Sequence, residues 1–284
     1  MAEPAPSLAL RLRHRLVAPV RGVLGQQRML DWYFAGYWLL RGAAYRLARL
    51  ARPGTTPRIA VISMWDENQA ALAAITGPNK AAYCRRHGYA WLPQTAGFVA
   101  ERPLSWSKIA FLRRLLPAYD WVMWSDADSL ITNPALRLEP LVDQPADLLI
   151  TCDHNGVNAG SFLLRNCAWS RRFLEELWEL PAHPDYTPAY ELWSDRMWDN
   201  RAFLLHLARP ESRRHCRFLP QRRLNSYHPQ LTEAGPASRH RPGDFVLHLP
   251  GIDNATRLQV LSDYARASET PPAPASPQRA PRPI

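Results

Sequence analysis

Short apolar runs alternate with helical patterns along the middle of the chain, from about residue 57 to residue 265. Five of these runs predict buried strands, at residues 58–63, 89–92, 121–125, 147–151 and 161–165. Three segments have helical spacing, at residues 68–87, 105–116 and 168–180. We expect Gly88 to end the first helix as its C-cap and Ser105 to cap the second. This alternation predicts a single α/β domain over residues 57–265, with a mostly parallel central sheet whose ligands bind beyond the carboxyl ends of the strands.

The first part of the chain has a different pattern, which predicts a basic amphipathic helical leader over residues 1–56. Nine arginines lie in residues 1–52 against two acidic residues, a net charge of +7, so the remaining 232 residues carry only +3 of the total of +10. On a helical wheel the apolar side holds Leu30, Tyr33, Tyr37, Leu40, Ala44 and Leu47. The opposite side largely holds Arg28, Arg41, Arg46, Arg49 and Arg52. Such a helix suits an anionic membrane surface, but it would also pack on the folded domain or on a partner subunit, and both alternatives stay open.

A membrane-spanning leader is not expected. In the predicted helical part of the leader, the longest stretch without a charged residue is residues 32–40, which has nine residues. A helix that spans a membrane needs about 20. Arginines interrupt every apolar run and no small-residue cleavage site follows a clean apolar core, so we do not expect a secretory signal either. We therefore expect a cytoplasmic protein, with peripheral contact at the inner face of the cytoplasmic membrane through residues 1–52 as one of the two roles open to the leader.

Composition narrows the class of protein. A hydrophobic content of 46% and 11 tryptophans are ample for a sizeable core, while the proline-rich residues 266–284 predict a disordered tail. No two cysteines have C-x-x-C spacing, so we expect four reduced thiols: Cys84, Cys152, Cys167 and Cys216. A nucleic-acid binder spreads basic residues over its folded face. Because the body of this chain is close to neutral, a nucleic-acid partner is not expected.

The strongest chemical signal is a pair of carboxylates at the end of an apolar strand. Residues 121–125 run directly into Asp126 and Asp128. Two residues at i and i+2 lie on the same side of an extended backbone, so their carboxylates can converge on one cation. Hard oxygen ligands suit Mn²⁺ or Mg²⁺ better than Zn²⁺. The pair therefore predicts a divalent-metal site at an edge of the sheet.

Two weaker signals follow along the chain. Residues 155–162 hold two glycines and two asparagines. They are typical either of a turn that leads into a buried strand or of a loop whose free amides lie against a sugar or phosphate. A further strand, over residues 244–248, ends in His248 beside a Pro-Gly turn. A lone histidine at a strand end is more often structural than a metal ligand.

Seven segments of the chain resemble motifs of a known protein family and occur in the same order as in that family. They are Asn79-Lys-Ala-Ala-Tyr-Cys-Arg-Arg-His-Gly88, Trp106-Ser-Lys-Ile109, Trp124-Ser-Asp-Ala-Asp-Ser129, Asn158-Ala-Gly-Ser-Phe-Leu-Leu-Arg-Asn-Cys-Ala-Trp-Ser170, Trp198-Asp-Asn200, Leu224-Asn-Ser-Tyr227 and His248-Leu-Pro-Gly251. Over residues 58 to about 252 the chain resembles glycosyltransferase family 34, the group of plant xyloglucan xylosyltransferases and fungal α-galactosyl- and α-mannosyltransferases.

The resemblance implies a GT-A fold, a nucleotide-sugar donor, dependence on Mn²⁺ (with Mg²⁺ as the alternative) and retention of anomeric configuration. We expect a UDP- or GDP-sugar as the donor and a glycan or glycolipid as the acceptor. It makes Asp126, Asp128 and His248 the metal ligands. Asp199 and Asn200 stand where family members have Asp-Gln beside the transferred sugar, and they are the catalytic candidates. The candidate substrate-binding residues are Ser63, Lys108, Asn158, Gly160, Ser161, Gly251 and Arg257.

The chain departs from the family pattern at two places. Asn200 is one methylene shorter than the usual glutamine. After the His-x-x-Gly turn, Ile252 and Asp253 replace a cysteine and a lysine that faces the diphosphate. An acidic group there would repel phosphate, so we expect Arg257 to supply the positive charge. Two other functions stay open: a metal-dependent phosphohydrolase with the same aspartates, and a non-catalytic sugar- or nucleotide-binding module.

Overall fold

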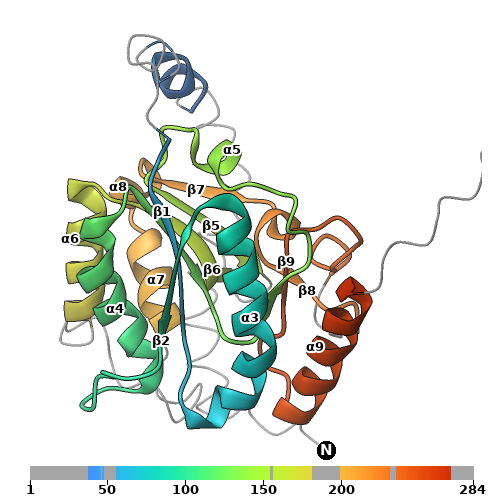
Figure 1. Cartoon of the computed structure of the whole chain (residues 1–284). Coiled ribbons are helices and arrows are strands. Elements are labelled where there is room, and N and C mark those ends of the chain that lie inside the picture. The colour runs from blue at the N-terminus through green and yellow to red at the C-terminus, as the bar shows by residue number, and fades with distance from the viewer. Residues whose placement is uncertain are drawn as a thin grey trace, which may run out of the picture.

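The computed structural model describes residues 38–45, 47, 56–153, 156–180, 199–230 and 235–269 (Figure 1). Its centre is a six-stranded sheet of order β2-β1-β3-β6-β5-β7. The strands are β1 (Ile59–Met64), β2 (Ala90–Gln94), β3 (Trp121–Ser125), β5 (Leu148–Asp153), β6 (Gly156–Arg165) and β7 (Cys216–Leu219). Only β6 runs against its neighbours in this sheet, β3 and β5. The predicted mostly parallel α/β sheet is confirmed.

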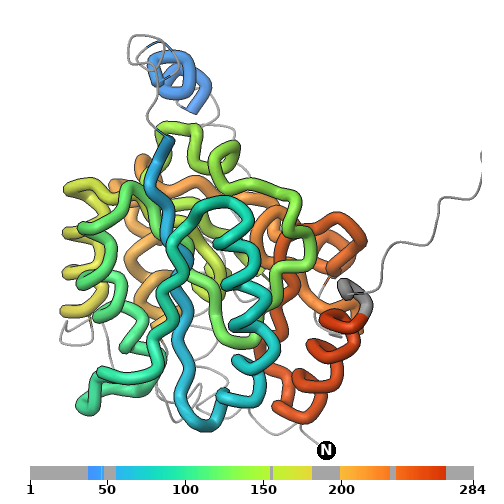
Figure 2. Tube along the Cα trace, in the orientation of Figure 1, coloured from blue at the N-terminus to red at the C-terminus, as the bar shows by residue number. Residues whose placement is uncertain are grey.

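Helices cover both faces of this sheet (Figure 1). On one face lie α4 (Ser107–Leu115), α6 (Ala168–Glu179) and α7 (Asp199–Leu207). On the other lie α3 (Ala70–His87), α5 (Glu139–Val142) and, beside α3, α9 (Asn254–Glu269) (Figure 2). The residues of β1 alternate between two hydrophobic clusters, with Ala60 and Ile62 in the first and Ile59 and Val61 in the second. Burial on both faces explains why this strand is a continuous apolar run in the sequence.

A second, three-stranded sheet adjoins the first. It has the order β4-β9-β8 and consists of β4 (Ser129–Ile131), β8 (Ser226–Tyr227) and β9 (Val246–His248). Its apolar side chains pack with those of α3 and α9 in a third cluster. The connection from β3 to β4 therefore passes from the large sheet to the small one. Short helical turns complete the described elements: η1 (Glu67–Gln69), η2 (Leu104–Trp106), η3 (Leu116–Ala118), α8 (Pro210–Arg213) and η6 (Gln221–Arg223).

Two local predictions are confirmed, one is wrong, and one choice between two alternatives is decided. The strand over residues 121–125 and the C-cap at Gly88, which has φ 74° and donates its N–H to Cys84 O, are as predicted. Ser105 does not cap α4, because that helix begins at Ser107 after a 3₁₀ turn; the Ser105 hydroxyl instead accepts a 3.4 Å hydrogen bond from the Asp199 amide. Two alternatives were open for residues 155–162, and residues 156–162 form a strand rather than a loop with free amides. Strand β6 already begins at Gly156, residues 156–158 pair with β5, and Ser161 and Phe162 pair with β3.

The two ends of the chain are described in part. Residues 38–45 are helical and lie at the end of the sheet where β1 begins (Figure 1). Trp38 packs against the second cluster, whereas Leu39 and Leu40 are 71% and 72% exposed. At the other end, α9 continues to Glu269, so the tail boundary expected at residue 266 falls inside a helix. The rest of the predicted leader and tail lies outside the described residues.

The described residues also bear on the state of the cysteines and on the apolar character of the helices. The four cysteines are free thiols, as predicted. Within the described part of the chain, none of the helices has both the length and the apolar character that crossing a bilayer requires.

Candidate metal and donor site

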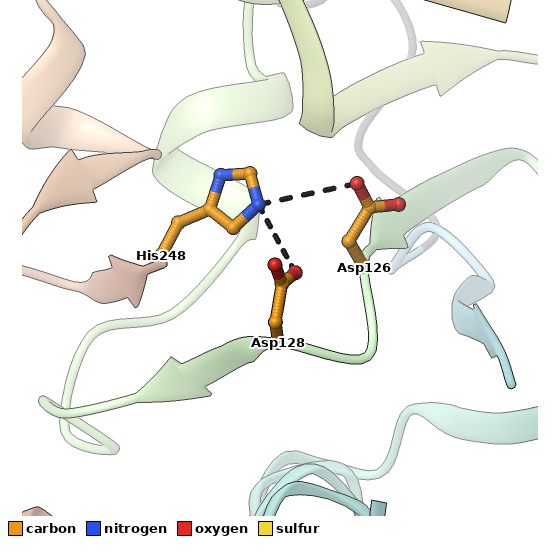
Figure 3. Close-up of side chains that lie close together, drawn as sticks. All are labelled: Asp126, Asp128 and His248. Atoms are coloured by element: carbon orange, nitrogen blue, oxygen red, sulfur yellow. Dashed lines mark ion pairs between the residues drawn. The ribbon is translucent and has the colours of Figure 1, made fainter. Parts of the chain in front are cut away.

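Three side chains from two sheets converge where β3 ends. Asp126 and Asp128 lie in the connection from β3 to β4, and His248 ends β9, which pairs with β4 so that Ser129 stands opposite His248. The Nε2 atom of His248 is 3.1 Å from Asp128 Oδ1 and 4.0 Å from Asp126 Oδ2 (Figure 3). One ligand atom from each of the three residues lies within 4.8 Å of the others. The structure thus brings together the three residues that the sequence proposes as metal ligands.

This donor set fits a divalent cation. Two carboxylate oxygens and one imidazole nitrogen suit Mn²⁺ or Mg²⁺, with coordination positions left for phosphate oxygens. The Asp128 side chain is 10% exposed, and two carboxylates held this close are costly without positive charge. Burial raises the pKa of Asp126, against the attraction of Lys108. Burial also acts to raise the pKa of Asp128, but attraction to His248 and Arg257 outweighs it, and the pKa lies below the usual range.

One face of α3 holds the backbone that carries the two aspartates. Thr76 Oγ1 donates to Ala127 O at 2.7 Å, and Lys80 Nζ donates to Asp126 O at 2.7 Å. Asn79 donates its amide to Ile131 O and accepts from Ile131 N. Positions i, i+3 and i+4 lie on one side of a helix, so three neighbouring side chains fix residues 126–131. Burial lowers the pKa of Lys80 to about 7, against attraction to the two aspartates.

A buried lysine links the metal-site carboxylates to the first residue of α7. Lys108 Nζ lies 2.8 Å from Asp199 Oδ2 and 3.4 Å from Asp126 Oδ1, and it donates to Ala159 O at 3.0 Å. Burial acts to lower the pKa of Lys108, but attraction to the two carboxylates outweighs it and raises the pKa. Lys108, a predicted substrate-binding residue, therefore stands between a metal-ligand candidate and the catalytic candidate Asp199.

A cavity of about 530 Å³ opens beside these groups, at the carboxyl ends of β1 and β3. This is the place that the general rule for α/β sheets gives for a ligand. The cavity is lined by Met64, Asp66, Asn68, Gln69, Pro103, Leu104, Ser105, Lys108, Asp126, Ala127, Asp199, Asn254 and Arg257.

Arg257 and Asp253 have separate places at the start of α9. Arg257 lines the cavity, where its Nη2 is 3.1 Å from Asp128 Oδ2 and its Nε donates to Leu249 O. Asp253 is not among the lining residues. Its carboxylate accepts hydrogen bonds from the backbone N–H and the hydroxyl of Thr256, which is the geometry of an N-cap. The acidic residue that replaces the expected lysine thus has a structural partner. Arg257, together with Lys108, supplies positive charge to the cavity wall.

Asn200 is oriented differently from what the sequence suggests. Its Oδ1 accepts from Ala159 N at 2.8 Å, and its Nδ2 donates to Val157 O at 2.8 Å. The side-chain amide thereby pairs with β6 as a neighbouring strand would. Both polar atoms of the Asn200 side chain hydrogen-bond to the backbone of β6. Asn200 therefore holds the first turn of α7, which also carries Asp199, against the sheet.

The remaining candidates do not line the cavity. Ser63 is buried and lies 3.4 Å from Lys80 Nζ, and Ser161 is fully buried, with no hydrogen-bond partner for its hydroxyl among the described residues. Gly251 is in the turn after β9 and has φ 71°. Gly160 lies under the imidazole of His248, and Asn158 belongs to a hydrogen-bond chain behind that ring.

Sequence reasoning missed the roles of Asn79, Lys80 and Asn225. Asn79 and Lys80 hold the aspartate backbone, and Asn225 Oδ1 is 2.7 Å from His248 Nδ1. All three lie in segments that resemble the family. The resemblance could have marked these residues as functionally relevant. It could not have shown their hydrogen-bond partners, which are more than 20 residues away in sequence.

The sequence profile of the galactosyl transferase GMA12/MNN10 family, which is glycosyltransferase family 34, matches residues 57–148 and 140–259. The chain belongs to this family. A family 34 relative, the probable α-1,6-mannosyltransferase MNN10 of Saccharomyces cerevisiae, is 29% identical over 234 residues, 68% of this chain and 58% of the relative. Galactomannan galactosyltransferase 1 of Cyamopsis tetragonoloba is 33% identical over 131 residues, 42% of this chain and 29% of the relative. The chain thus spans less than two thirds of these relatives.

A solved structure supports the fold of this family 34 chain. A glycosyltransferase involved in the glycosylation of the major capsid of PBCV-1 matches 73% of this chain and 100% of its own, with a TM-score of 0.58 and 14% identity. At this identity the likeness concerns the fold alone. The predicted GT-A fold is confirmed.

Proposed function

We propose that this family 34 chain is a metal-dependent glycosyltransferase that moves a hexose or pentose from a UDP- or GDP-sugar to a glycan or glycolipid, with retention of anomeric configuration. One observation carries the proposal: Asp126, Asp128 and His248 converge beside a cavity that Lys108, Asp199 and Arg257 reach. The printed names of its relatives, a probable mannosyltransferase and a galactosyltransferase, support sugar transfer.

The main requirement of this reaction is that negative charge on the leaving group is stabilised. A divalent cation held by Asp126, Asp128 and His248, Mn²⁺ or alternatively Mg²⁺, would offset negative charge on the departing nucleoside diphosphate. Arg257 stands at the same wall of the cavity and binds the diphosphate by charge-assisted hydrogen bonds. It takes the part that the lysine has in other family members.

Lys108 and Asp199 serve the sugar side. Lys108 keeps Asp199 in place through the 2.8 Å ion pair, and Asp199 orients the sugar and stabilises positive charge at its anomeric carbon. The bond from that carbon to the phosphate oxygen breaks, and the acceptor oxygen bonds to the same face. The acceptor proton passes to the departing phosphate oxygen, so no covalent sugar–enzyme intermediate is required.

A panel of nucleotide sugars tests the function. The protein is incubated with each donor in Mn²⁺, Mg²⁺ or EDTA, and release of nucleoside diphosphate is measured with and without candidate acceptors. We expect release that depends on the metal and rises with acceptor. A double variant, Asp126→Ala with Asp128→Ala, should lose it; undiminished turnover would refute the proposal. Free sugar as the sole product would instead indicate a hydrolase.

The leader suggests where the enzyme works. We propose a cytoplasmic protein that touches the inner face of the cytoplasmic membrane through residues 1–52. The net charge of +7 in that segment and the exposed Leu39, Leu40 and Leu47 support this contact. Deleting residues 1–52 should abolish sedimentation with anionic vesicles, while the triple Leu→Ser variant at 39, 40 and 47 should weaken it. Unchanged vesicle binding after the deletion would remove the membrane contact from the proposal.

A further inference from the structure

Behind His248, on the side away from the two aspartates, polar side chains form one continuous chain of hydrogen bonds. His248 Nδ1 is 2.7 Å from Asn225 Oδ1. Asn225 Nδ2 is 2.8 Å from Asn158 Oδ1, and Asn158 Nδ2 is 2.9 Å from Asp153 Oδ2. The hydroxyl of Tyr227 donates to the same Asp153 oxygen. The chain therefore connects a metal-ligand candidate to a carboxylate through two asparagine amides.

The direction of every donor in this chain is fixed by its surroundings. The backbone N–H of Gly160 points at one polar atom of the Asn158 amide, at 2.9 Å, and a backbone N–H can only donate, so that atom is the oxygen. The other atom of Asn158 is then the nitrogen, and it faces the Asp153 carboxylate, which accepts. Asn225 must in turn offer its NH₂ group to Asn158 Oδ1. Its carbonyl oxygen is left to face His248.

An oxygen that only accepts requires a hydrogen on the atom opposite it. Asn225 Oδ1 therefore requires Nδ1 of His248 to carry the hydrogen, and in a neutral imidazole Nε2 is then a free lone pair. This matters because Asp128, 3.1 Å from Nε2, favours the opposite tautomer, with a hydrogen on Nε2 that would exclude a cation. Two neighbours thus compete for the position of one hydrogen, and Asn225 is the one that leaves Nε2 able to bind metal.

We propose that Asn225 is a positioning residue that holds His248 in the Nδ1–H tautomer and so presents Nε2 to the divalent cation. The inference rests on the proposed metal-dependent function, to which it adds a residue that touches neither metal nor substrate. Groups that hydrogen-bond to a metal-binding histidine typically change metal affinity about 10- to 100-fold when they are removed.

Two substitutions at the same position separate this role from a merely structural one. Asn225→Leu and Asn225→Asp both lose the NH₂ group that bonds to Asn158, so both lose stability. Only Asn225→Asp keeps an acceptor opposite Nδ1. A third variant, Thr151→Val, serves as control. Thr151 Oγ1 is the other acceptor of the Asn225 NH₂ group, at 3.3 Å, so its loss leaves the acceptor opposite His248 Nδ1 in place.

The first measurement is Mn²⁺ affinity, by calorimetry or by the electron paramagnetic resonance signal of free Mn²⁺. We expect Asn225→Leu to bind about 10- to 100-fold more weakly than the wild type, and Asn225→Asp and Thr151→Val to stay close to the wild type. Equal affinity in the leucine and wild-type proteins would overturn the proposal, and so would equal weakening in the leucine and aspartate variants.

The second measurement needs no metal. In ¹⁵N-histidine-labelled protein, measured at a pH high enough for the ring to be neutral and with His248→Gln for assignment, His248 should have a pyridine-like Nε2 and a pyrrole-like Nδ1. The reverse pattern in the wild type would overturn the proposal even if Asn225→Leu fails to fold. If the wild type binds no Mn²⁺ and releases no nucleoside diphosphate, the proposed function fails, while the nitrogen spectrum still decides the tautomer separately.

Discussion

Gly160 leaves room for the imidazole of His248: a β carbon at position 160 would lie 2.2 Å from His248 Cε1 and 2.9 Å from each ring nitrogen. Contacts this short are not tolerated, so any side chain here displaces the ring. The requirement for glycine in β6 thus comes from a histidine in another sheet, and not from a phosphate lying on the backbone.

Replacing this glycine should disturb the metal site. Gly160→Ala is expected to weaken Mn²⁺ binding at least as much as removing a hydrogen-bond partner of a metal-binding histidine does, about 10- to 100-fold, and to lower turnover with it. Calorimetric Mn²⁺ titration measures the effect. Gly77→Ala is the matched control, because a β carbon there would meet only Trp65 Cη2, at 3.8 Å. Wild-type affinity in Gly160→Ala would contradict the prediction.

Lys108 should be needed for stability as well as for turnover. Lys108→Met leaves Asp126 and Asp199 without their shared cation, and breaking a buried ion pair costs about 3–5 kcal/mol. Denaturant unfolding should therefore show a large loss in the free energy of unfolding. The double variant Lys108→Met with Asp199→Asn should regain part of it while both variants stay inactive. A single variant as stable as the wild type would show that the ion pair contributes little.

Substitutions of Arg257 and Asp253, the two charged residues at the start of α9, should have different effects on donor kinetics and on stability. Arg257→Gln removes a cation from the cavity wall, and a hydrogen bond to a charged group contributes about 1.5–3 kcal/mol, which corresponds to about 10- to 150-fold in kcat/KM for the donor. Asp253→Ala removes the cap on Thr256 and should lower Tm slightly without changing KM. Steady-state kinetics and thermal unfolding of the two variants test this. A higher KM in Asp253→Ala would place its carboxylate at the donor after all.

A buried histidine away from the site should make stability depend on pH. Burial lowers the pKa of His206, against its hydrogen bond to Glu176, so the folded protein favours the neutral ring. As pH falls through the ordinary histidine range, the unfolded chain takes up a proton that the folded protein does not, and the free energy of unfolding decreases. Tm should fall between about pH 7.5 and about pH 5.5, and His206→Gln should fall less steeply. Parallel curves for the two proteins would argue against this assignment.

The sequence predicts those parts of the fold and site that depend on neighbouring residues. The apolar run before Asp126 and Asp128 is enough to place a buried strand and its edge, because both periodicity and burial are local properties. The position of Arg257 was also predictable, because the acidic Asp253 required another cation to be found nearby. In both cases the residues that support the prediction lie within a few positions of the residue that is predicted.

Other parts could not be predicted because their partners are distant in sequence. Asn200 looks like a shortened catalytic glutamine until its hydrogen bonds to Val157 and Ala159 are known. The glycines and asparagines of residues 155–162 are compatible with either a turn or a loop, since nothing local shows that residues 156–158 pair with β5. The role of Asn225 depends on a backbone N–H at Gly160, which no periodicity in the sequence indicates.

Because β6 contributes Gly160 and Asn158 to the candidate metal site, the geometry of that site depends on the register of this antiparallel strand. Asn158 and Gly160 face His248 and its hydrogen-bond chain, while Ala159 and Ser161 alternate with them along the strand. A slip of one residue against β3 would exchange these two sets, because side chains in a strand alternate between faces. Such a molecule would keep most of its sheet hydrogen bonds and its compactness, yet it would put a β carbon against the imidazole. The proposed metal binding would therefore be a better measure of correct folding than secondary-structure content.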